Sequence, residues 1–516
     1  MAKGGENRSS EGMATRWFAA ILASVFFLLE LIQILHHGMW EDEMQVWSFS
    51  QHSHSLSELH YVTRYEGHPE GWQLLVYFIS QFSSNPFAMQ FLHLAIATMT
   101  AYVVARYSPF SRLQKVLIVF GYFLFYEYAA ISRDYALGVF GLFSFCAVFR
   151  PGPRKNYILL ALLLALMAES NIYALILALS LALMILFEAM QTDQRRRYLS
   201  SKPKEIVCAA ALFLAAVSIS LLHMRPPADI GWNVVSDLSV RASKGLSGTL
   251  AMIWIAFVPI PRLSHQFWSS NFLGAHYRVM AVLSTLLVAV SVLFFIRKRT
   301  VLFLYLCGLG ALCLFKKLVY TGTVRHDGHA FVLFLACMWL AKYYPEQAFP
   351  SRRVDKAAER LKPYQDGLLE GLLSVQVIAA LVASVIALSV PFSQAKAVSA
   401  FLRANHMDHM FIIGDPDFAA SSIAGYLNRD FYYPRGDRMG SYVLWDNRRT
   451  RPTEPILELS KRKAAERQQD VLVILNTRDA SAQEIASFQG SIVAWEDYYV
   501  YLVQAEKPKA NSSPDR

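Results

Sequence analysis

The chain has 516 residues, of which 54% are hydrophobic and only 17% are charged. A soluble chain usually carries about a quarter charged residues, so this composition and the many long apolar runs exclude a soluble protein and indicate a multi-pass membrane protein. The formal net charge of +10 lies mostly in short loops between apolar runs, where it encodes membrane orientation, so nucleic acid is not an expected partner.

Eleven apolar runs are expected to cross the membrane as helices. The first, 17–35, follows Lys3, Arg8 and Arg16 and lacks a small-residue cleavage site, which predicts an uncleaved anchor with a cytoplasmic N-terminus. The other expected spans are 86–106, 115–131, 134–149, 156–169, 171–189, 206–224, 278–296, 300–318, 328–342 and 368–391.

Two further apolar runs, 70–82 and 247–261, are ambiguous. Counting either as a single crossing would put basic loops such as the arginines at 195–197 on the outside, against the rule that cytoplasmic loops carry the positive charge. We therefore expect both runs to lie along the membrane surface or to re-enter it. This places the C-terminus outside.

Three parts follow from this topology: a cytoplasmic tail at 1–16, a transmembrane domain at 17–391 with a large outward first loop at 36–85, and an outward domain at 392–516. The last part is polar enough to fold in water, and its pattern predicts a small α/β domain. Strands are expected at 409–415, 470–476 and 491–503, and helices at 417–428 and 454–469.

The stretch MWEDEMQVW, residues 39–47, places Glu41, Asp42 and Glu43 directly after the first span. Solvated interfacial acids are one interpretation, but the first loop far exceeds the usual ~4–6 residues and the short link fixes the acids near the headgroups. A carboxylate at that depth can act as general base on an acceptor while a lipid-phosphate sugar presents its head from the bilayer.

These acids begin a short helix-like segment. Its apolar residues are expected to lie on the membrane, namely Met44, Val46, Trp47 and Phe49.

Other ionisable residues gather at the outward ends of spans, where such groups often serve function when they face a protein interior. His68 precedes a proline at an expected helix start, and Glu127, Arg133 and Asp134 lie in the second outward turn. Structural readings stay open here, namely a normal helix start at Pro69 and a snorkelling Arg133 paired with Asp134.

A second group of cations lies late in the membrane domain, in FKKLVYTGTVRHDGH at 315–329. Positive charge is otherwise scarce on the outward side, so phosphate recognition is a reasonable explanation, with snorkelling as the structural alternative. The candidate substrate-binding residues of this segment are Lys316, Lys317, Arg325 and His326.

Taken in order, these motifs resemble those of the GT-C membrane glycosyltransferases, especially the bacterial family 39, protein O-mannosyltransferase and aminoarabinose-transferase type. The family's acidic motif in the first outward loop matches Asp42-Glu43. Its surface-helix motif, of the His/Lys-Pro-Pro-Leu-Tyr type, matches the HPEGW stretch at 68–72, in which Glu70 replaces the second proline.

Two further motifs carry the resemblance, which covers about residues 17–345. The family's charged turn after the third span matches Arg133-Asp134-Tyr135, and its late basic motif matches Arg325-His326. Each motif is short and is weak evidence for the family when taken alone. The order of the motifs and their shared outward side are more specific evidence.

The resemblance implies a GT-C-like fold in the bacterial inner membrane, with the outward loop 36–85 and the domain 392–516 in the periplasm. It also implies an inverting transfer of a hexosyl or pentosyl group from a polyprenyl-phosphate sugar at the periplasmic face. Asp42 would be the catalytic acid-base residue, assisted by Glu43 or Asp134. Glu41 would tune or orient it, and Tyr135 would belong to the substrate-binding set. Two like charges beside Asp42 are expected to raise its proton affinity and to favour a base role.

The sugar, its lipid carrier and the acceptor (a lipid, a glycan or a protein) stay open, as does a divalent cation, Mg²⁺ or Mn²⁺. Asp42-Glu43 alone is poor evidence for a metal. Two other classes remain alternatives: a transporter or flippase for a lipid-linked saccharide, and a non-catalytic envelope scaffold. A transporter predicts internal repeats and mid-span charges, and neither is evident here.

Overall fold

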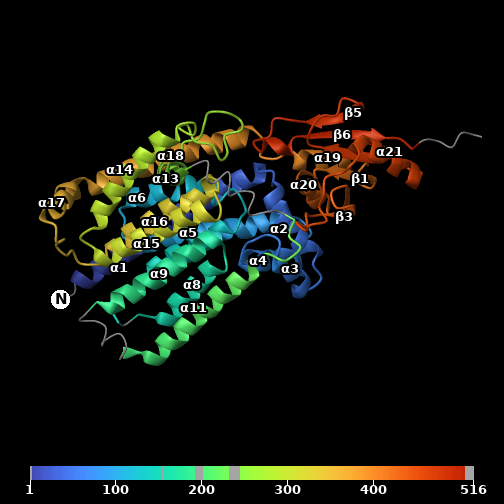
Figure 1. Cartoon of the computed structure of the whole chain (residues 1–516). Helices are drawn as coiled ribbons and strands as arrows, with labels where there is room; N and C mark the ends of the chain where they lie inside the picture. The colour runs from blue at the N-terminus through green and yellow to red at the C-terminus, as the bar shows by residue number, and fades with distance from the viewer. Residues whose placement is uncertain (1–2, 154, 192–200, 232–244, 506–516) are drawn as a thin grey trace, which may run out of the picture.

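A computed structural model describes residues 3–153, 155–191, 201–231 and 245–505. A long helical domain carries a small sheet domain at one end, built from the C-terminal part of the chain (Figure 1). The arginines at 195–197, on which the predicted topology partly depends, lie outside the described residues.

Within the described ranges, seven helical stretches are long and apolar enough to cross a membrane, so the chain is a multi-pass membrane protein. They are Met13–His36 of α1 (Lys3–His36), α5 (Phe87–Tyr107), α9 (Ile172–Met190), α11 (Pro203–His223), α14 (Tyr277–Phe295), α15 (Arg299–Leu318) and the Arg352–Ser389 stretch of α17 (Arg352–Leu361) and α18 (Gln365–Ser389). Shorter apolar helices are α4 (Gly71–Ser80), α7 (Tyr135–Val148), α8 (Tyr157–Ala168) and α13 (Gly245–Phe257). The number of eleven spans therefore stays a prediction.

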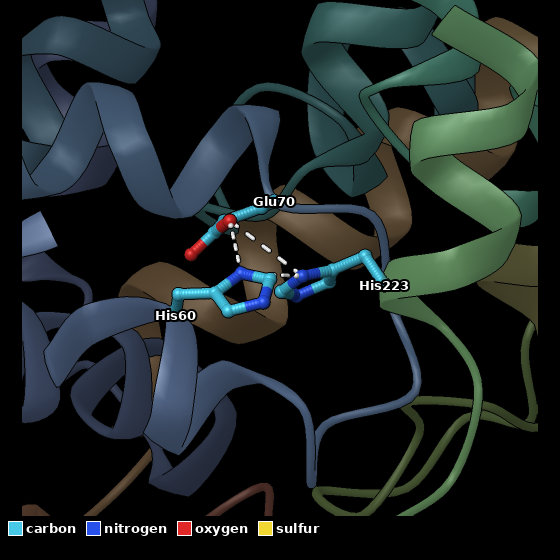
Figure 2. A group of neighbouring side chains, drawn as sticks. All are labelled: His60, Glu70 and His223. Carbon is cyan, nitrogen blue, oxygen red and sulfur yellow. Dashed lines mark hydrogen bonds and ion pairs between the residues drawn. The ribbon is translucent and has the colours of Figure 1, made fainter. Parts of the chain in front are cut away.

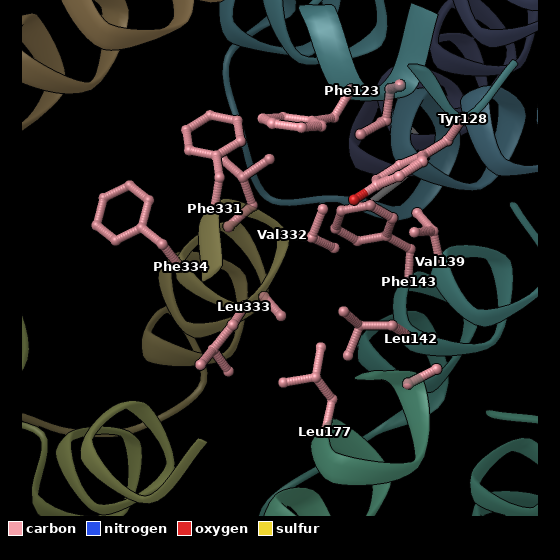
Figure 3. Packing of buried hydrophobic residues seen from close by; sticks show 14 of the residues in the cluster. Phe123, Tyr128, Val139, Leu142, Phe143, Leu177, Phe331, Val332, Leu333 and Phe334 are labelled. Atoms are coloured by element: carbon pink, nitrogen blue, oxygen red, sulfur yellow. The ribbon is translucent and has the colours of Figure 1, made fainter. Parts of the chain in front are cut away.

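The central helix of the domain is α16 (Val324–Ala341), which is buried almost throughout and packs against α13, α15 and α7. Beyond His329 it is apolar all round, the pattern of a helix enclosed by other helices. Gly328 permits the tightest contact, because a Cβ there would collide with the ring of Phe123. Figure 3 shows the aromatic packing on this side, where the ring of Phe331 contacts those of Phe123 and Phe334.

The expected span at 115–131 is wrong as a single helix. It consists of α6 (Arg112–Val119) and a π-helical turn, η1 (Tyr122–Glu127), separated by Gly121 in an extended conformation (φ −72°, ψ 156°). Such π-helical turns are rare and often occur at functional sites. The break brings the polar end of η1 back into the protein, where Glu127 accepts hydrogen bonds from Tyr122 and Trp268.

The first loop, at 36–85 and predicted to face outward, folds into α2 (Glu41–His52), α3 (Leu56–Thr63) and α4, and α2 packs between α4 and α20 (Asp417–Leu427) of the C-terminal domain. The apolar residues of α2 that were expected to lie on the membrane are instead buried in this core, which is a correction to the sequence analysis. They are Met44, Val46, Trp47 and Phe49. A periodic apolar face indicates burial, but it does not distinguish lipid from a neighbouring domain.

The C-terminal domain is a six-stranded mixed sheet in the order β3-β2-β1-β4-β6-β5. Its strands are β1 (Phe411–Asp415), β2 (Phe431–Tyr433), β3 (Arg438–Gly440), β4 (Val471–Leu475), β5 (Glu484–Phe488) and β6 (Tyr498–Val503), and its helices are α19 (Ala395–Ala404), α20 and α21 (Ile456–Arg467). β1 pairs parallel with β2 and β4, whereas β6 is antiparallel to β4 and β5.

The expected α/β domain is thus confirmed, with two corrections. Residues 491–495 form no strand, because the segment ends in a short turn, η4 (Ala494–Glu496). The strands β2, β3 and β5 were not predicted, since two of them have three residues and β5 alternates between half-buried and exposed positions.

Candidate active site at the first outward loop

Glu43 anchors the first turn of α2. Its Oε2 accepts the backbone N–H of Trp40 at 3.3 Å and contacts His37 Nε2 at 2.7 Å, while its Oε1 accepts the backbone N–H of Ser132 at 2.6 Å. The carboxylate is fully buried. Because both oxygens are engaged, Glu43 ties three segments together, which makes it a positioning residue and leaves it poorly placed to take a proton from a substrate.

Asp42 faces two guanidinium groups. Its Oδ2 lies 3.0 Å from Nη2 of Arg325 and 3.6 Å from Nη2 of Arg133, and Nη1 of Arg133 donates to the carbonyl of Asp42 at 2.7 Å. The Asp42 side chain is 29% exposed, compared with about a tenth for each arginine. It is therefore the member of the acidic run that both meets cations and reaches solvent.

These cations overturn the expected effect of the neighbouring acids on Asp42. Burial raises the pKa of its carboxyl, but Arg133 and Arg325 favour the charged form more strongly, so the pKa lies below its ordinary value of 3.8. The prediction that Glu41 and Glu43 raise the proton affinity of Asp42 is therefore wrong. Asp42 is ionised at neutral pH.

Glu41 lies at the junction with the C-terminal domain. Its backbone N–H donates to Oε1 of Glu496 at 2.5 Å, and Ser422 Oγ donates to the same oxygen at 3.0 Å. Burial raises the pKa of Glu41 well above its ordinary value, and the charges of Asp42 and Glu496 add to that effect. Burial likewise raises the pKa of Glu496 to about 8. Glu41 is thus placed beside another acid and away from the centre of the arginine pair.

Arg325, on the first turn of α16, is the cation closest to Asp42. Its guanidinium lies over the rings of Trp40 and Trp268, with 5.1 Å and 5.4 Å to the ring centroids. Its Nε and Nη1 are buried and have no hydrogen-bond partner among the described residues. A buried guanidinium with two unused donors is suited to an anionic ligand such as a phosphate.

Asp134 and His68 form a carboxylate–histidine pair, and Asp134 is the residue after Arg133. His68 Nδ1 lies 3.5 Å from Oδ2 of Asp134, and neither carboxylate oxygen of Asp134 has a hydrogen-bond partner within the described part of the chain. Burial lowers the pKa of His68, while Asp134 opposes that shift. His68 is therefore mainly neutral at pH 7. Arg133 pairs with Asp42, and not with Asp134 as the structural alternative had it.

His326 joins this group to the start of α16. Its Nδ1 accepts the backbone N–H of Thr323 at 2.7 Å, so a neutral ring carries its proton on Nε2, which lies 2.9 Å from the hydroxyl of Tyr135. The two side chains predicted as substrate-binding, Tyr135 and His326, are thus in direct contact and hold one another in place.

Of the remaining predicted residues, Glu127 is buried in the protein, whereas Lys316 and Lys317 line a cavity. Glu127 is buried and accepts from Tyr122 and Trp268, so it supports the aromatic wall behind Arg325. Lys316 pairs with Asp327 at 2.5 Å, and both line a cavity of about 200 Å³ together with Lys317 and residues 321–324. This cavity includes Val324, the residue before Arg325, so it reaches the start of α16.

Sequence reasoning missed several supporting residues. His37 contacts Glu43, and Trp268 lies against Arg325. Glu496, from the C-terminal domain, accepts the backbone N–H of Glu41. Only His37 had a local signal, since it directly follows the first span and precedes the acids. The described residues also include a group with metal-ligand spacing, made of His60, Glu70 and His223. The sequence did not indicate that these three side chains lie together.

No family model and no curated protein matches the sequence. Among solved structures, the chain is similar to ArnT from Cupriavidus metallidurans bound to undecaprenyl phosphate, with 13% identity, a TM-score of 0.43 and coverage of 95% of this chain and 99% of ArnT. The apo state of ArnT gives 14% identity and a TM-score of 0.42.

The arabinofuranosyltransferase AftD from Mycobacteria gives 10% identity and a TM-score of 0.35, over 95% of this chain and 40% of AftD. All three likenesses are at 10–14% sequence identity and concern the fold.

Proposed function

We propose that this protein is a membrane glycosyltransferase that moves a sugar from a polyprenyl-phosphate donor to an acceptor hydroxyl at the periplasmic face. The observation that carries the proposal is the pairing of Asp42 with Arg325. A solvent-reaching carboxylate lies 3.0 Å from a guanidinium that keeps Nε and Nη1 unused by any described residue. One side chain can accept a proton while the other binds the leaving phosphate.

The donor's phosphate is proposed to bind at Arg325, with the cavity lined by Lys316 and Lys317 beside it. Charge-assisted hydrogen bonds to phosphate are about twice as strong as neutral ones, and the two unused N–H groups of Arg325 can make them. The rings of Trp40 and Trp268 fix the guanidinium plane. The donor class is the one to which undecaprenyl phosphate, bound in the ArnT structure, belongs.

The reaction is proposed to be an inverting displacement. The acceptor oxygen forms a bond to the anomeric carbon as the bond from that carbon to the phosphate oxygen breaks, and the acceptor's proton passes to an Asp42 carboxylate oxygen. The leaving group is the polyprenyl phosphate, whose added charge is stabilised by Arg325. Because the pKa of Asp42 is low, it takes the proton late, once the acceptor oxygen has become acidic.

Asp42→Asn in the full-length protein, reconstituted in lipid, tests the proposal. Wild type and variant are incubated with a panel of polyprenyl-phosphate sugars, and both donor binding and sugar release are measured. We expect the variant to bind the donor and to release sugar about 10²–10⁴-fold more slowly, the usual contribution of a general base. Asp366→Asn, an exposed acid on α18, is the matched control and should leave turnover unchanged.

Two results would contradict the proposal. If Asp42→Asn turns over donor at the wild-type rate, Asp42 is not the base. If the wild type binds the donors but moves the whole lipid-linked saccharide between leaflets without releasing sugar, the protein is a flippase.

A further inference from the structure

Three potential metal ligands converge on the outward side of the helical domain, apart from Asp42 (Figure 2). His60 Nδ1 lies 3.2 Å from Oε2 of Glu70, His223 Nδ1 lies 3.6 Å from the same oxygen, and the two Nδ1 atoms are 3.1 Å apart. These three atoms therefore form a small triangle with sides of 3.1 to 3.6 Å.

The triangle has the dimensions of a tetrahedral zinc site. With bonds of about 2.1 Å to nitrogen or oxygen, tetrahedral geometry separates neighbouring ligand atoms by about 3.4 Å. The three observed separations of 3.1, 3.2 and 3.6 Å lie around that value. A set of two histidines and one carboxylate is also a recurrent zinc ligand set, whereas Mg²⁺ and Ca²⁺ favour oxygen ligands.

The ligands come from three separate segments. His60 is on α3, Glu70 is the residue before α4, and His223 is the last residue of α11. Glu70 is further oriented by Thr63, whose Oγ1 donates to its other oxygen, Oε1, at 3.0 Å. A hydrogen bond that orients a ligating carboxylate is typical of the outer shell of metal sites.

We propose that His60, Glu70 and His223 bind one Zn²⁺ ion. Two neutral imidazoles and one carboxylate give the site a net charge of −1, so a divalent cation is electrostatically favoured. The His223 side chain is 3% exposed and that of His60 is 55% exposed, so the fourth coordination position faces solvent on the His60 side. Water can occupy that position.

The ion would connect the first outward loop to the end of α11. Glu70 follows His68 by two residues, and the next residue, Gly71, donates its N–H to the carbonyl of Glu169 at 2.9 Å. The zinc site and this hydrogen bond would together fix the segment that presents His68 to Asp134. The metal site itself stands on the ligand geometry alone, and only its effect on turnover rests on the proposed function.

Metal analysis of the full-length protein tests the site. The protein is purified with a tag that contains no histidine, stripped with a chelator, and titrated with Zn²⁺, and bound metal is measured by mass spectrometry. Co²⁺ then serves as a probe, because its visible absorption reports tetrahedral coordination by nitrogen and oxygen. We expect one zinc per wild-type chain, an affinity at least about tenfold lower in His60→Ala and in Glu70→Gln, and no tetrahedral cobalt spectrum in either variant.

His54→Ala is the matched control, since His54 is an exposed histidine just before α3 and outside the triangle. It should bind zinc as the wild type does. His60 is more than half exposed, so His60→Ala should keep the wild-type melting temperature in chelator and should lose the increase that zinc gives the wild type.

The proposal is overturned if the wild type shows no saturable zinc binding at micromolar concentration. It is equally overturned if His60→Ala and Glu70→Gln bind zinc as tightly as His54→Ala. Neither outcome depends on sugar transfer, so the failure of this proposal is distinct from the failure of the proposed function.

Discussion

Oε1 of Glu496 accepts the backbone N–H of Glu41 at 2.5 Å, so a residue of the C-terminal sheet domain binds the first turn of the helix that carries Asp42. Close by, the backbone N–H of Met39 donates to the hydroxyl of Tyr426 at 2.8 Å. The C-terminal domain therefore helps to position the candidate site, rather than being attached at a distance from it.

The junction between Glu41 and Glu496 is predicted to weaken at alkaline pH. Burial raises the pKa of Glu496 from its ordinary value of 4.5 to about 8, so the folded state keeps a proton that the unfolded state has lost between these values. Its stability contribution is complete below about pH 4.5 and is lost as pH rises through 8. We expect the melting temperature of the wild type to fall across this interval, and Glu496→Gln to remove that part of the decrease.

Thermal melts of the purified protein at pH 5, 7 and 9 measure this effect. Glu458→Gln, which changes an exposed acid on α21 of the same domain, serves as the control and should keep the wild-type dependence on pH. The interpretation fails if Glu496→Gln and the wild type lose the same number of degrees between pH 5 and pH 9.

Arg325→Lys is predicted to weaken donor binding while the charge is kept. Lysine cannot supply the planar set of N–H groups, and it loses the Nε and Nη1 donors that are unused by any residue described in the structure. A hydrogen bond to a charged group contributes about 1.5–3 kcal/mol, so we expect about 10–100-fold weaker binding of the polyprenyl-phosphate donor. Binding of free polyprenyl phosphate should weaken by a similar factor, whereas equal affinity of wild type and variant would place the phosphate elsewhere.

Glu43→Ala and Asp42→Asn should distinguish a residue that holds the fold from a residue that takes part in the reaction. Removing the Glu43 carboxylate leaves the buried N–H groups of Trp40 and Ser132 without an acceptor, and we expect a loss of about 3–5 kcal/mol in unfolding free energy. Glu43→Gln keeps one acceptor oxygen and should lose less. Asp42→Asn should lower the melting temperature less than Glu43→Ala, because it removes the ion pairs with Arg133 and Arg325 at a side chain that is partly exposed. Denaturation midpoints for the three variants provide the comparison.

Gly328→Ala is predicted to disturb the packing beneath Arg325. A Cβ at this position of α16 would collide with the ring of Phe123 and lie 2.5 Å from the hydroxyl of Tyr128, which donates to the carbonyl of Arg325. Overpacking of this kind costs about 1–3 kcal/mol.

Gly310→Ala is the control for that change, because it also lies in a membrane helix and a Cβ there meets nothing within 4 Å. We expect Gly310→Ala to be neutral or slightly stabilising, as alanine favours helices over glycine. Melting temperatures of the two variants in detergent should therefore move in opposite directions or differ by several degrees. Equal melting temperatures would contradict the packing seen in Figure 3.

The features that could be predicted from the sequence are those with a local signal. Long apolar runs predicted the membrane helices, and alternating or continuous apolar segments predicted β1, β4 and β6. The break before η1 depends on the conformation of Gly121 and on the contact of α18 with η1, so hydropathy alone did not reveal it.

For the site, the sequence identified residue types but not their partners. Asp42, Arg133 and Arg325 were each recognised as outward-facing charges, but only the fold shows that one carboxylate lies between two guanidiniums and so has a lowered pKa. The histidines that meet Glu70 could not be paired either, because His60 and His223 are 163 residues apart in the sequence.

Glu41, Asp42 and Glu43 follow one another in the chain, but they do not form a single acidic surface. Successive residues of an α-helix are rotated by about 100° around its axis, so three neighbours point in three directions. Here the Glu41 side chain meets Trp495 and Glu496 of the sheet domain, that of Asp42 meets the arginines, and that of Glu43 meets His37 at the end of the first span. Inserting or deleting one residue before Glu41 would therefore give each acid a different partner. Exchanging the positions of these residues should disturb the site more than removing one of the acids.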